Sequence, residues 1–522
     1  MASERAESRA TATRLAGRAS MLRAADPGLF RRLKVVLTEV GFTEAGICER
    51  IGVKSMSTFA HRRELPLTDA LAACILLFLH DEPVPQSFFS SVMPADAPGL
   101  MQELGLLQWD AVLPDHWRAP LSLYPIHGLY LVSDQLLQVI EWNGRKAPDD
   151  VVYPALSGPT AEFIEGFPLT PCDALLDIGT GTGIAALVAA ANGARQIWAV
   201  DITERSSHMC EYNARLNGID SVIVRTGDLY DPVAGLTFDR IVAHPPYMPE
   251  PESHMIFRDG GSDGEQITRR IITGLPHYLR PGGRFYCRCL ATDRAGGDFE
   301  QRIRALLGPA HDEFDVVVIS ALTMPPGEYY GMQAVRGELP FDALERHLQS
   351  FGEIEAKNLI ISFVHIERHT QPQPPLTVRR KIGSGFSPRT AVIDWLLAWE
   401  RAQRTTGFSE MVLQARPTVT QHATIELAHR MTEGRLRALA GRAHTQYPFL
   451  FSMESSPGLV LMLGACDGSR TVTQLHHEMR ELGVIPANTP TDEFLEFIRH
   501  LTSGAVLEFE GFKIPERVTS DA

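Results

Sequence analysis

The stretch Leu175-Leu-Asp-Ile-Gly-Thr-Gly-Thr-Gly183 decides the fold, because it joins an apolar run to a glycine-rich turn. Asp201 ends the next apolar run, and the tetrapeptide His244-Pro-Pro-Tyr247 ends a later one. Glycine adopts left-handed backbone easily and lets a ligand approach the main chain closely. A turn of this kind between a strand and a helix also presents the free N–H groups of the helix N-terminus. Together the three features predict a ligand site across the carboxyl ends of neighbouring parallel strands.

Short apolar runs alternate with helical segments on both sides of this stretch, over residues 149–370. This alternation is typical of a mostly parallel sheet whose two faces are covered by helices. We therefore predict an α/β domain with a Rossmann-like, seven-stranded sheet. The expected strands are residues 174–178, 197–200, 222–224, 240–243, 284–289, 315–320 and 359–366.

The composition limits the class of protein. The 522 residues, 44% hydrophobic and 21% charged, are enough for roughly three globular domains. A net charge of −14 argues against binding nucleic acid mainly through non-specific phosphate contacts, which need a basic surface. Scattered cysteines favour a reducing compartment, and no apolar run is long enough to cross a bilayer, so we expect a cytoplasmic protein without membrane contact. Cys287-Arg-Cys289 has no second Cys/His pair nearby, so we expect no metal site.

Five segments are expected along the chain. Residues 1–27 are predicted to form a flexible tail, and residues 28–148 a helical, winged-helix-like domain that recognises the substrate. The α/β domain occupies residues 149–370. A proline-rich linker and a helix follow at residues 371–404. Residues 405–522 are predicted to form a small α+β, winged-helix-like domain.

The two flanking domains rest on weaker patterns. Helical periodicity at residues 30–40 and 67–79 precedes two strand-like runs at 121–124 and 129–132. Basic side chains in this region could contact nucleic acid, but a structural or substrate-docking domain fits the acidic chain better. In the C-terminal part we expect helices at 472–482 and 492–503, a cap at Gly504 and a strand at 505–509. That order resembles the peptide-binding modules of the PqqD family, with a capping or dimerisation domain as the alternative.

The central motifs resemble those of a known enzyme class. The spacing Gly179-x-Gly181-x-Gly183 differs from the dinucleotide pattern G-x-G-x-x-G, whose ligand is a pyrophosphate. With the acidic residues after the first two strands, it resembles a class I S-adenosylmethionine-dependent methyltransferase. More narrowly, it is similar to the HemK-type branch, which includes protein-glutamine and ribosomal-RNA amino methyltransferases and whose bacterial members can carry a helical N-terminal extension. The motifs similar to that branch are Asn213-Ala-Arg-Leu-Asn-Gly218, His244-Pro-Pro-Tyr247 and Arg258-Asp-Gly-Gly-Ser-Asp-Gly264.

The resemblance implies S-adenosylmethionine as the cofactor, with S-adenosylhomocysteine as its product. The glycine turn would bind the amino-acid end of the cofactor, and Asp177 would hold its ammonium group. Asp201 would accept hydrogen bonds from the ribose hydroxyls, and Asp228 from the adenine amine. The implied cofactor-binding residues are Asp177, Gly179, Thr180, Gly181, Gly183, Asp201, Ile202, Asp228, Leu229 and His244. The implied catalytic residues are His244, Pro245, Pro246 and Tyr247.

The first position of the tetrapeptide departs from the family pattern, which has Asn-Pro-Pro-Tyr. Prolines offer no N–H, so the Pro245 carbonyl is left to accept a hydrogen bond from the substrate, and Tyr247 would stack on the target group. His244 either fills the Asn position as a hydrogen-bond acceptor or takes a proton from the nucleophile. A base helps a hydroxyl, a protonated amine or an acidic N–H more than an amide nitrogen, which loses its proton after attack. The substitution therefore favours an amine, imidazole or hydroxyl acceptor over glutamine.

We therefore expect N-methylation of a protein, a peptide or a small-molecule acceptor. One alternative is a ribosomal-RNA amino methyltransferase, which the net charge disfavours. Another is a non-catalytic adaptor that binds S-adenosylmethionine, and a dinucleotide oxidoreductase is a more distant one. The sequence leaves open whether the chain forms a homodimer.

Overall fold

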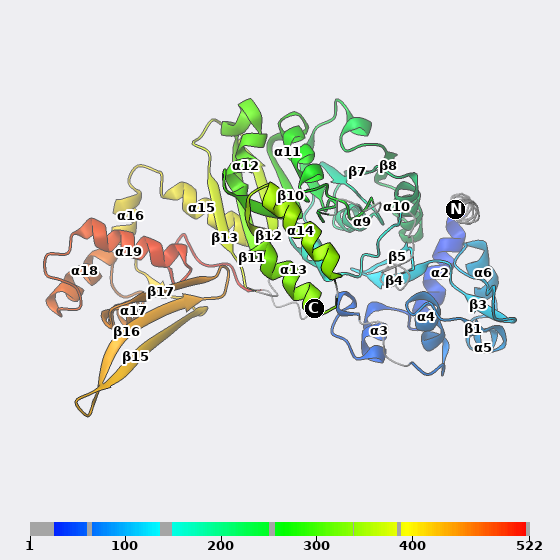
Figure 1. Ribbon diagram of the computed structural model, residues 1–522, viewed down its shortest axis with the longest axis horizontal. Helices are drawn as coiled ribbons and strands as arrows, with labels where there is room; N and C mark the ends of the chain where they lie inside the picture. Colours follow the sequence, from blue (N-terminus) through cyan, green and yellow to red (C-terminus); the bar gives the residue numbers. More distant parts are fainter. Residues whose placement is uncertain are drawn as a thin grey trace. The chain divides into compact units, whose positions relative to one another are not determined.

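The structure, a computed structural model, describes residues 26–59, 65–135, 149–249, 256–337, 339–383 and 388–517 (Figure 1). Residues 1–25 of the predicted tail lie outside the described residues. The chain divides into two compact units, which we describe separately. The first comprises residues 1–314, 324–359 and 364–373, and the second comprises residues 315–323, 360–363 and 374–522. Within the described ranges, no helix has the length and apolar character needed to cross a membrane.

A mostly parallel sheet of eight strands is the central feature, in the order β13-β11-β12-β10-β9-β6-β7-β8. The neighbouring strands from β10 to β8 run parallel along this order. All seven predicted strands lie within observed ones, which confirms the α/β, Rossmann-like fold. The strands are β6 (Ala174–Ile178), β7 (Gln196–Asp201), β8 (Val222–Thr226), β9 (Phe238–Ala243), β10 (Leu279–Arg294), β11 (Phe314–Met324), β12 (Ala356–Arg368) and β13 (Thr377–Lys381).

The eighth strand corrects the prediction of seven. β13 lies where a linker was expected at residues 371–404, and it pairs parallel with β11 at the edge of the sheet. Its sequence, Thr-Val-Arg-Arg-Lys, contains one apolar residue, and Val378 alone among the five is buried. An edge strand that buries so little leaves almost no hydrophobic pattern in the sequence.

The strand order reverses at β6, whose neighbours are β7 on one side and β9 on the other. In open α/β sheets, ligands bind at the carboxyl ends of the strands where the order reverses. Helices α9 and α10 contact the β6–β8 side of the sheet (Figure 1). The helices of this region are α8 (Gly158–Glu165), α9 (Ile184–Ala191), α10 (Glu204–Asn217), α11 (Gln266–Tyr278), α12 (Phe299–Leu306), α13 (Pro326–Val335) and α14 (Phe341–Glu353), with the 3₁₀ turns Asp231–Val233 and Gly308–Glu313.

The N-terminal part of the first unit packs on α10 and shares its hydrophobic core. Phe30 meets Tyr212 of α10 edge to face, with ring centroids 5.1 Å apart. Its helices are α2 (Pro27–Glu39), α3 (Glu44–Ile51), α4 (Ala70–Phe78), α5 (Gln86–Val92) and α6 (Ala97–Glu103), with a 3₁₀ turn at Met56–Thr58. Its strands are β1 (Val84–Pro85), β2 (Gln108–Trp109), β3 (His116–Arg118), and the β4 (Ser122–Ile126) and β5 (Leu129–Ser133) hairpin. The winged-helix-like character of this part stays a prediction.

Asn213 on α10 connects the hairpin to the glycine turn. Its side-chain amide N–H donates to the carbonyls of Val132 (3.0 Å) and Thr182 (2.8 Å), and its oxygen accepts from the Val132 N–H at 2.7 Å. The residue is completely buried. One side chain therefore satisfies backbone groups of two segments that are far apart in the sequence.

The second unit has a core around Trp399, Leu475 and Ile498, each completely buried. Its helices are α15 (Thr390–Ala402), α16 (Phe408–Gln414), α17 (Gly458–Ala465), α18 (Val472–Glu481) and α19 (Thr491–Ser503). Its strands are β14 (Thr418–Val419), β15 (Ala423–Thr432), β16 (Arg435–Thr445), β17 (Phe451–Ser455) and β18 (Leu507–Glu508). β18 covers only two residues of the strand predicted at 505–509, and the rest of that segment is irregular. The domain boundaries expected at residues 148, 370 and 404 stay predictions.

Replacing Asn213 by alanine tests its structural role. The change leaves two carbonyls and one N–H without partners in a buried place, so we expect the free energy of unfolding to fall by about 2–4 kcal/mol. Urea denaturation measures this. Asn192, an exposed residue that caps α9 by donating to the Val188 carbonyl, is the control, and Asn192→Ala should cost far less. Equal losses for the two variants would contradict the proposed link.

Candidate functional site

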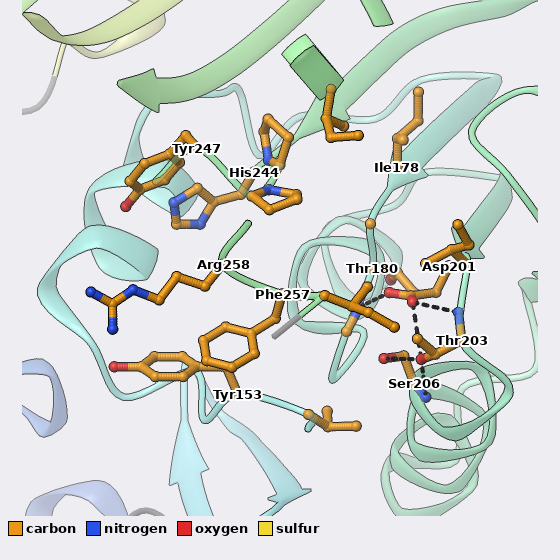
Figure 2. Close-up of a pocket in the computed structure, with 18 of the residues that line it drawn as sticks. Tyr153, Ile178, Thr180, Asp201, Thr203, Ser206, His244, Tyr247, Phe257 and Arg258 are labelled. Carbon is orange, nitrogen blue, oxygen red and sulfur yellow. Dashed lines mark hydrogen bonds between the residues drawn. The ribbon is translucent and has the colours of Figure 1, made fainter. Parts of the chain in front are cut away.

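A cavity of about 880 Å³ opens at the carboxyl ends of β6, β7, β8 and β9. β6 and β7 contribute lining residues themselves, and the segments directly after β8 and β9 contribute the others. This volume is within the usual range for pockets that bind small molecules. All predicted site residues line it except Gly183. Figure 2 shows two groups of labelled residues across the cavity: Thr180, Asp201, Thr203 and Ser206 on one side, and His244, Tyr247 and Arg258 on the other.

The glycine turn adopts left-handed backbone at each of its three glycines, with φ of 73° at Gly179, 53° at Gly181 and 85° at Gly183. Gly179 and Gly181 have open space where a Cβ would be, so a ligand can approach the main chain there. At Gly183, by contrast, a Cβ would lie 2.6 Å from Cys210 Sγ. Gly183 is therefore required for packing of the turn against α10, which is why it does not line the cavity.

Asp177 lies beneath the turn and is only 2% exposed. Its Oδ2 accepts from the Thr180 hydroxyl at 2.7 Å and from the Ala186 N–H at 3.2 Å. Burial raises the pKa of Asp177 to about 7, against the effect of these two hydrogen bonds. A cation at this edge of the cavity would favour the charged carboxylate and lower that pKa again.

Asp201 links the carboxyl ends of β6 and β7 through hydrogen bonds. Its Oδ2 accepts from the Gly181 N–H at 2.9 Å, and its Oδ1 accepts from the Thr203 N–H at 3.0 Å (Figure 2). Burial raises the pKa of Asp201. The Thr203 hydroxyl lies 3.2 Å from Oδ1 and 2.8 Å from Ser206 Oγ, and its single proton can serve only one of them. When it serves Ser206, the Asp201 carboxylate can accept from a ligand hydroxyl.

Asp228 and Ile202 lie on the same side of the cavity. The Asp228 carboxylate accepts from Arg270 at 2.6 Å, a partner that the sequence analysis did not anticipate, because α11 lies far along the chain. Ile202 is 55% exposed, which gives the cavity an apolar surface beside Asp201. Leu229 has φ of 48°, so the backbone turns sharply directly after Asp228.

His244 lies between two aromatic rings, with centroid distances of 5.2 Å to Phe163 and 5.6 Å to Tyr247. The residue keeps some exposed surface on the cavity, but its Nε2 is buried and has no hydrogen-bond partner among the described residues. Burial, and next the positive charge of Arg288, lower the pKa of His244 to about 3. The imidazole is therefore neutral at physiological pH, and a neutral imidazole has one nitrogen that can accept a hydrogen bond.

Tyr247 is held in place by Arg288 of β10. The guanidinium donates to the Tyr247 hydroxyl at 2.9 Å and lies over its ring at 5.8 Å. Arg288 also donates to Glu162 of α8 at 2.8 Å. In the sequence, Cys287-Arg-Cys289 raises only the question of metal binding, and the role of the arginine between the cysteines is not apparent.

Several further lining residues could not be anticipated. Tyr153 stacks on Phe257 with centroids 5.3 Å apart, and both lie beside Arg258 in Figure 2. Glu265, which directly precedes α11 and is only 1% exposed, accepts from Arg302 at 2.6 Å and 2.8 Å. Among the described residues, no group of three or more His, Cys, Asp or Glu is arranged to hold a metal ion.

Comparison with known proteins agrees with this geometry. Residues 159–292 match the family model of the methyltransferase small domain. The matched segment begins in α8 and ends in β10, and it contains the glycine turn, Asp201 and the His244 corner. A putative protein N5-glutamine methyltransferase of Methanocaldococcus jannaschii is 39% identical over 115 residues, which are 21% of this chain and 57% of that protein.

Other relatives carry related names. A release factor glutamine methyltransferase of Xylella fastidiosa is 35% identical over 118 residues, 20% of this chain and 43% of that protein. A ribosomal protein uL3 glutamine methyltransferase of Bradyrhizobium diazoefficiens is 33% identical over 131 residues, 23% of this chain and 41% of that protein. The chain thus spans about half the length of the curated relatives it matches.

Solved structures add little to this comparison. A ribosomal protein L11 methylase of Lactobacillus delbrueckii subsp. bulgaricus is 22% identical, with a TM-score of 0.22, and the alignment covers 38% of this chain and 70% of that one. A similarity this low carries no argument about the site. The evidence for the methyltransferase small domain is the sequence match and the arrangement of residues in the cavity.

A Gly183→Ala substitution should destabilise the protein more than Gly179→Ala. Both place a side chain in left-handed backbone, but only at position 183 does the new Cβ meet another atom, Cys210 Sγ. We expect a loss of about 2–4 kcal/mol at Gly183 and about 1–2 kcal/mol at Gly179, measured by urea denaturation without ligand. Adding Cys210→Ala to Gly183→Ala should recover part of the difference. No recovery would exclude the close contact as its cause.

Proposed function

We propose that this chain is an S-adenosylmethionine-dependent methyltransferase that methylates a nitrogen of a protein or peptide acceptor. The observation that carries the proposal is that the glycine turn, Asp201 and the His244-Pro-Pro-Tyr247 corner line one cavity, inside the segment that matches the methyltransferase small domain. The relatives named as glutamine methyltransferases, acting on release factor or ribosomal protein, support a side-chain amide as the acceptor.

The residues on the Asp201 side of the cavity fit the cofactor. Open backbone at Gly179 and Gly181 suits a carboxylate, and Asp177, whose pKa is about 7, gains its charge beside an ammonium group. The Asp201 carboxylate can accept from a ribose hydroxyl once Thr203 turns to Ser206. The exposed face of Ile202 suits an adenine ring. When bound, S-adenosylmethionine supplies an electrophilic methyl group.

The His244 side of the cavity fits a planar amide. The Pro245 carbonyl and a neutral imidazole nitrogen offer two acceptors for the N–H groups of one NH₂. Phe163 and Tyr247 enclose the corner with aromatic faces, and Arg288 fixes Tyr247. These residues orient the nucleophile and exclude water, which is the main task of an enzyme whose methyl donor is already activated.

The central experiment follows the methyl group. The purified chain is incubated with methyl-labelled S-adenosylmethionine and with cell extract, and the protein and RNA fractions are analysed by mass spectrometry. We expect label in protein, on a side-chain amide nitrogen. Label confined to RNA would instead favour a ribosomal-RNA methyltransferase, and cofactor binding without any transfer would favour an adaptor, so either result would overturn the proposal.

Asp201→Ala tests the cofactor side. We expect the affinity for S-adenosylmethionine to fall by about 1–3 kcal/mol, because hydrogen bonds to the ribose are lost and the Gly181 N–H loses its acceptor. Isothermal titration calorimetry measures the change. Asp220→Ala, at an exposed acid of the same region, is the matched control and should bind normally. Unchanged affinity in Asp201→Ala would exclude this orientation of the cofactor.

His244 should act as a neutral hydrogen-bond partner. Because its pKa is about 3, the ring gains a proton only in strong acid, so the rate of methyl transfer should not follow an ionisation of His244 between pH 6 and pH 9. His244→Asn should keep the rate within about tenfold, since it retains an acceptor, whereas His244→Leu should lose about ten- to a hundredfold. Single-turnover rates across pH measure this. A rate that falls below pH 7 in the wild type but not in His244→Asn would establish a base instead.

A further inference from the structure

The β15–β16 hairpin of the second unit is unusually exposed. Its two strands, Ala423–Thr432 and Arg435–Thr445, are joined by Glu433 and Gly434 in left-handed backbone. Nine of the ten β15 residues are exposed, and Figure 1 shows the hairpin extending away from α17–α19. β17 pairs only with residues 441–445 of β16, so the rest of the hairpin has two strands. Two-stranded hairpins are marginally stable in water, so a long exposed one indicates a further contact.

The hairpin has two different faces. Residues paired directly across the strands share a face, and Arg430, Arg435, Arg437 and Arg442 all fall on one of them. The opposite face is largely apolar, with Met431 62% and Leu436 64% exposed near the tip. At the base of this apolar face, α17 covers the sheet, since a Cβ on Gly441 would meet Leu459 and Val460.

β15 is also an edge strand. Within the part of the chain that the structure describes, the sheet order is β15-β16-β17, so β15 has a strand on one side only. The outer N–H and C=O groups of an edge strand can pair with another strand. The irregularity in the β15–β16 ladder places the extra residue, Leu439, on β16. The outer edge of β15 therefore stays regular and can accept another strand.

The sequence of β15 is self-complementary about Ala428. Residues at equal distances before and after Ala428 form complementary pairs. These pairs are Leu427 with His429, Glu426 with Arg430, Ile425 with Met431, and Thr424 with Thr432. An antiparallel pairing with the two-fold axis at Ala428 would bring these residues opposite each other. Opposite charges, apolar pairs and Thr–Thr pairs are the cross-strand combinations that stabilise antiparallel sheets.

We propose that two copies of this chain associate through β15, which pairs antiparallel with β15 of the second copy around a two-fold axis at Ala428. The two three-stranded sheets then form one continuous sheet. Arg430 lies opposite Glu426 of the partner subunit, and the two-fold axis repeats this ion pair. A two-fold axis perpendicular to the sheet keeps the same face of both copies on one side. Met431 therefore lies beside the partner's Ile425 on the apolar face.

The proposed pairing also explains a local conflict of charge. Within one chain Arg430 lies directly across from Arg437, and like charges in that position are destabilising. Arg430 has no ion pair among the described residues, and Glu426 has only distant partners, Arg442 at 3.8 Å and His444 at 3.7 Å. The partner's Glu426 would supply the missing negative charge beside Arg430.

Charge reversal tests the register. Glu426→Arg places two arginines opposite each other at both symmetric positions, and Arg430→Glu places two glutamates there. We expect each single variant to associate at least about tenfold more weakly than the wild type. Sedimentation over about a hundredfold range of protein concentration measures this, since association follows mass action. A wild type that stays monomeric throughout, or either variant dimerising normally, would overturn the proposal.

Two further samples make the test specific to this pairing. The double variant Glu426→Arg/Arg430→Glu restores opposite charges within a homodimer, and an equal mixture of the two single variants restores them within a heterodimer. Both should regain association. Arg435→Glu, the same charge change at an exposed residue of β16, is the control and should dimerise normally. If the control behaves like Arg430→Glu, or neither sample recovers, the pairing about Ala428 is wrong.

Discussion

One hydrogen bond, from the Gly181 N–H to the Asp201 carboxylate, ties together the two strand ends on which the cavity depends. It can form only because three left-handed glycines bring the turn back over the end of β6, toward β7. Beneath the turn Asp177 accepts from Thr180 and from the start of α9, so carboxylates hold the loop from two directions. The desolvation of both acids, which raises their pKa values, is the cost of this arrangement, and a bound cation or hydroxyl would offset part of it.

The N-terminal part of the chain supports the glycine turn through α10. Asn213 accepts from and donates to β5 on one side and donates to the Thr182 carbonyl on the other, and Phe30 packs on the neighbouring Tyr212. Helix α10, which contacts the glycine turn, is thus held by β5 and α2, which precede the α/β sheet in the sequence. Because the glycine turn and the N-terminal part both depend on the position of α10, a ligand that binds the turn would also stabilise the N-terminal part.

The sequence predicts what depends on local pattern and misses what depends on distant contacts. The apolar runs identified all seven strands, and the predicted residues at their carboxyl ends line the cavity apart from Gly183, because strand periodicity and turn chemistry are local. Gly183, which the sequence assigned to the ligand, packs against Cys210 of another element and does not line the cavity. Arg288 and Arg270 were missed because only the folded sheet brings them to Tyr247 and Asp228. β13 was missed because an edge strand needs little apolar sequence.

The enclosure of His244 favours one of the two roles that the sequence left open, that of a neutral hydrogen-bond acceptor. A base that works at neutral pH needs a pKa near 7, and such a histidine is usually solvated or paired with a carboxylate. Here two aromatic rings and a nearby guanidinium surround the imidazole, and they favour the neutral form strongly. An amide nitrogen needs no base before attack, because its proton leaves only after the new bond has formed. For the proposed amide substrate, a neutral hydrogen-bond acceptor beside the Pro245 carbonyl would be sufficient. On that proposal, histidine replaces the Asn of the HemK-type pattern without a change of chemistry.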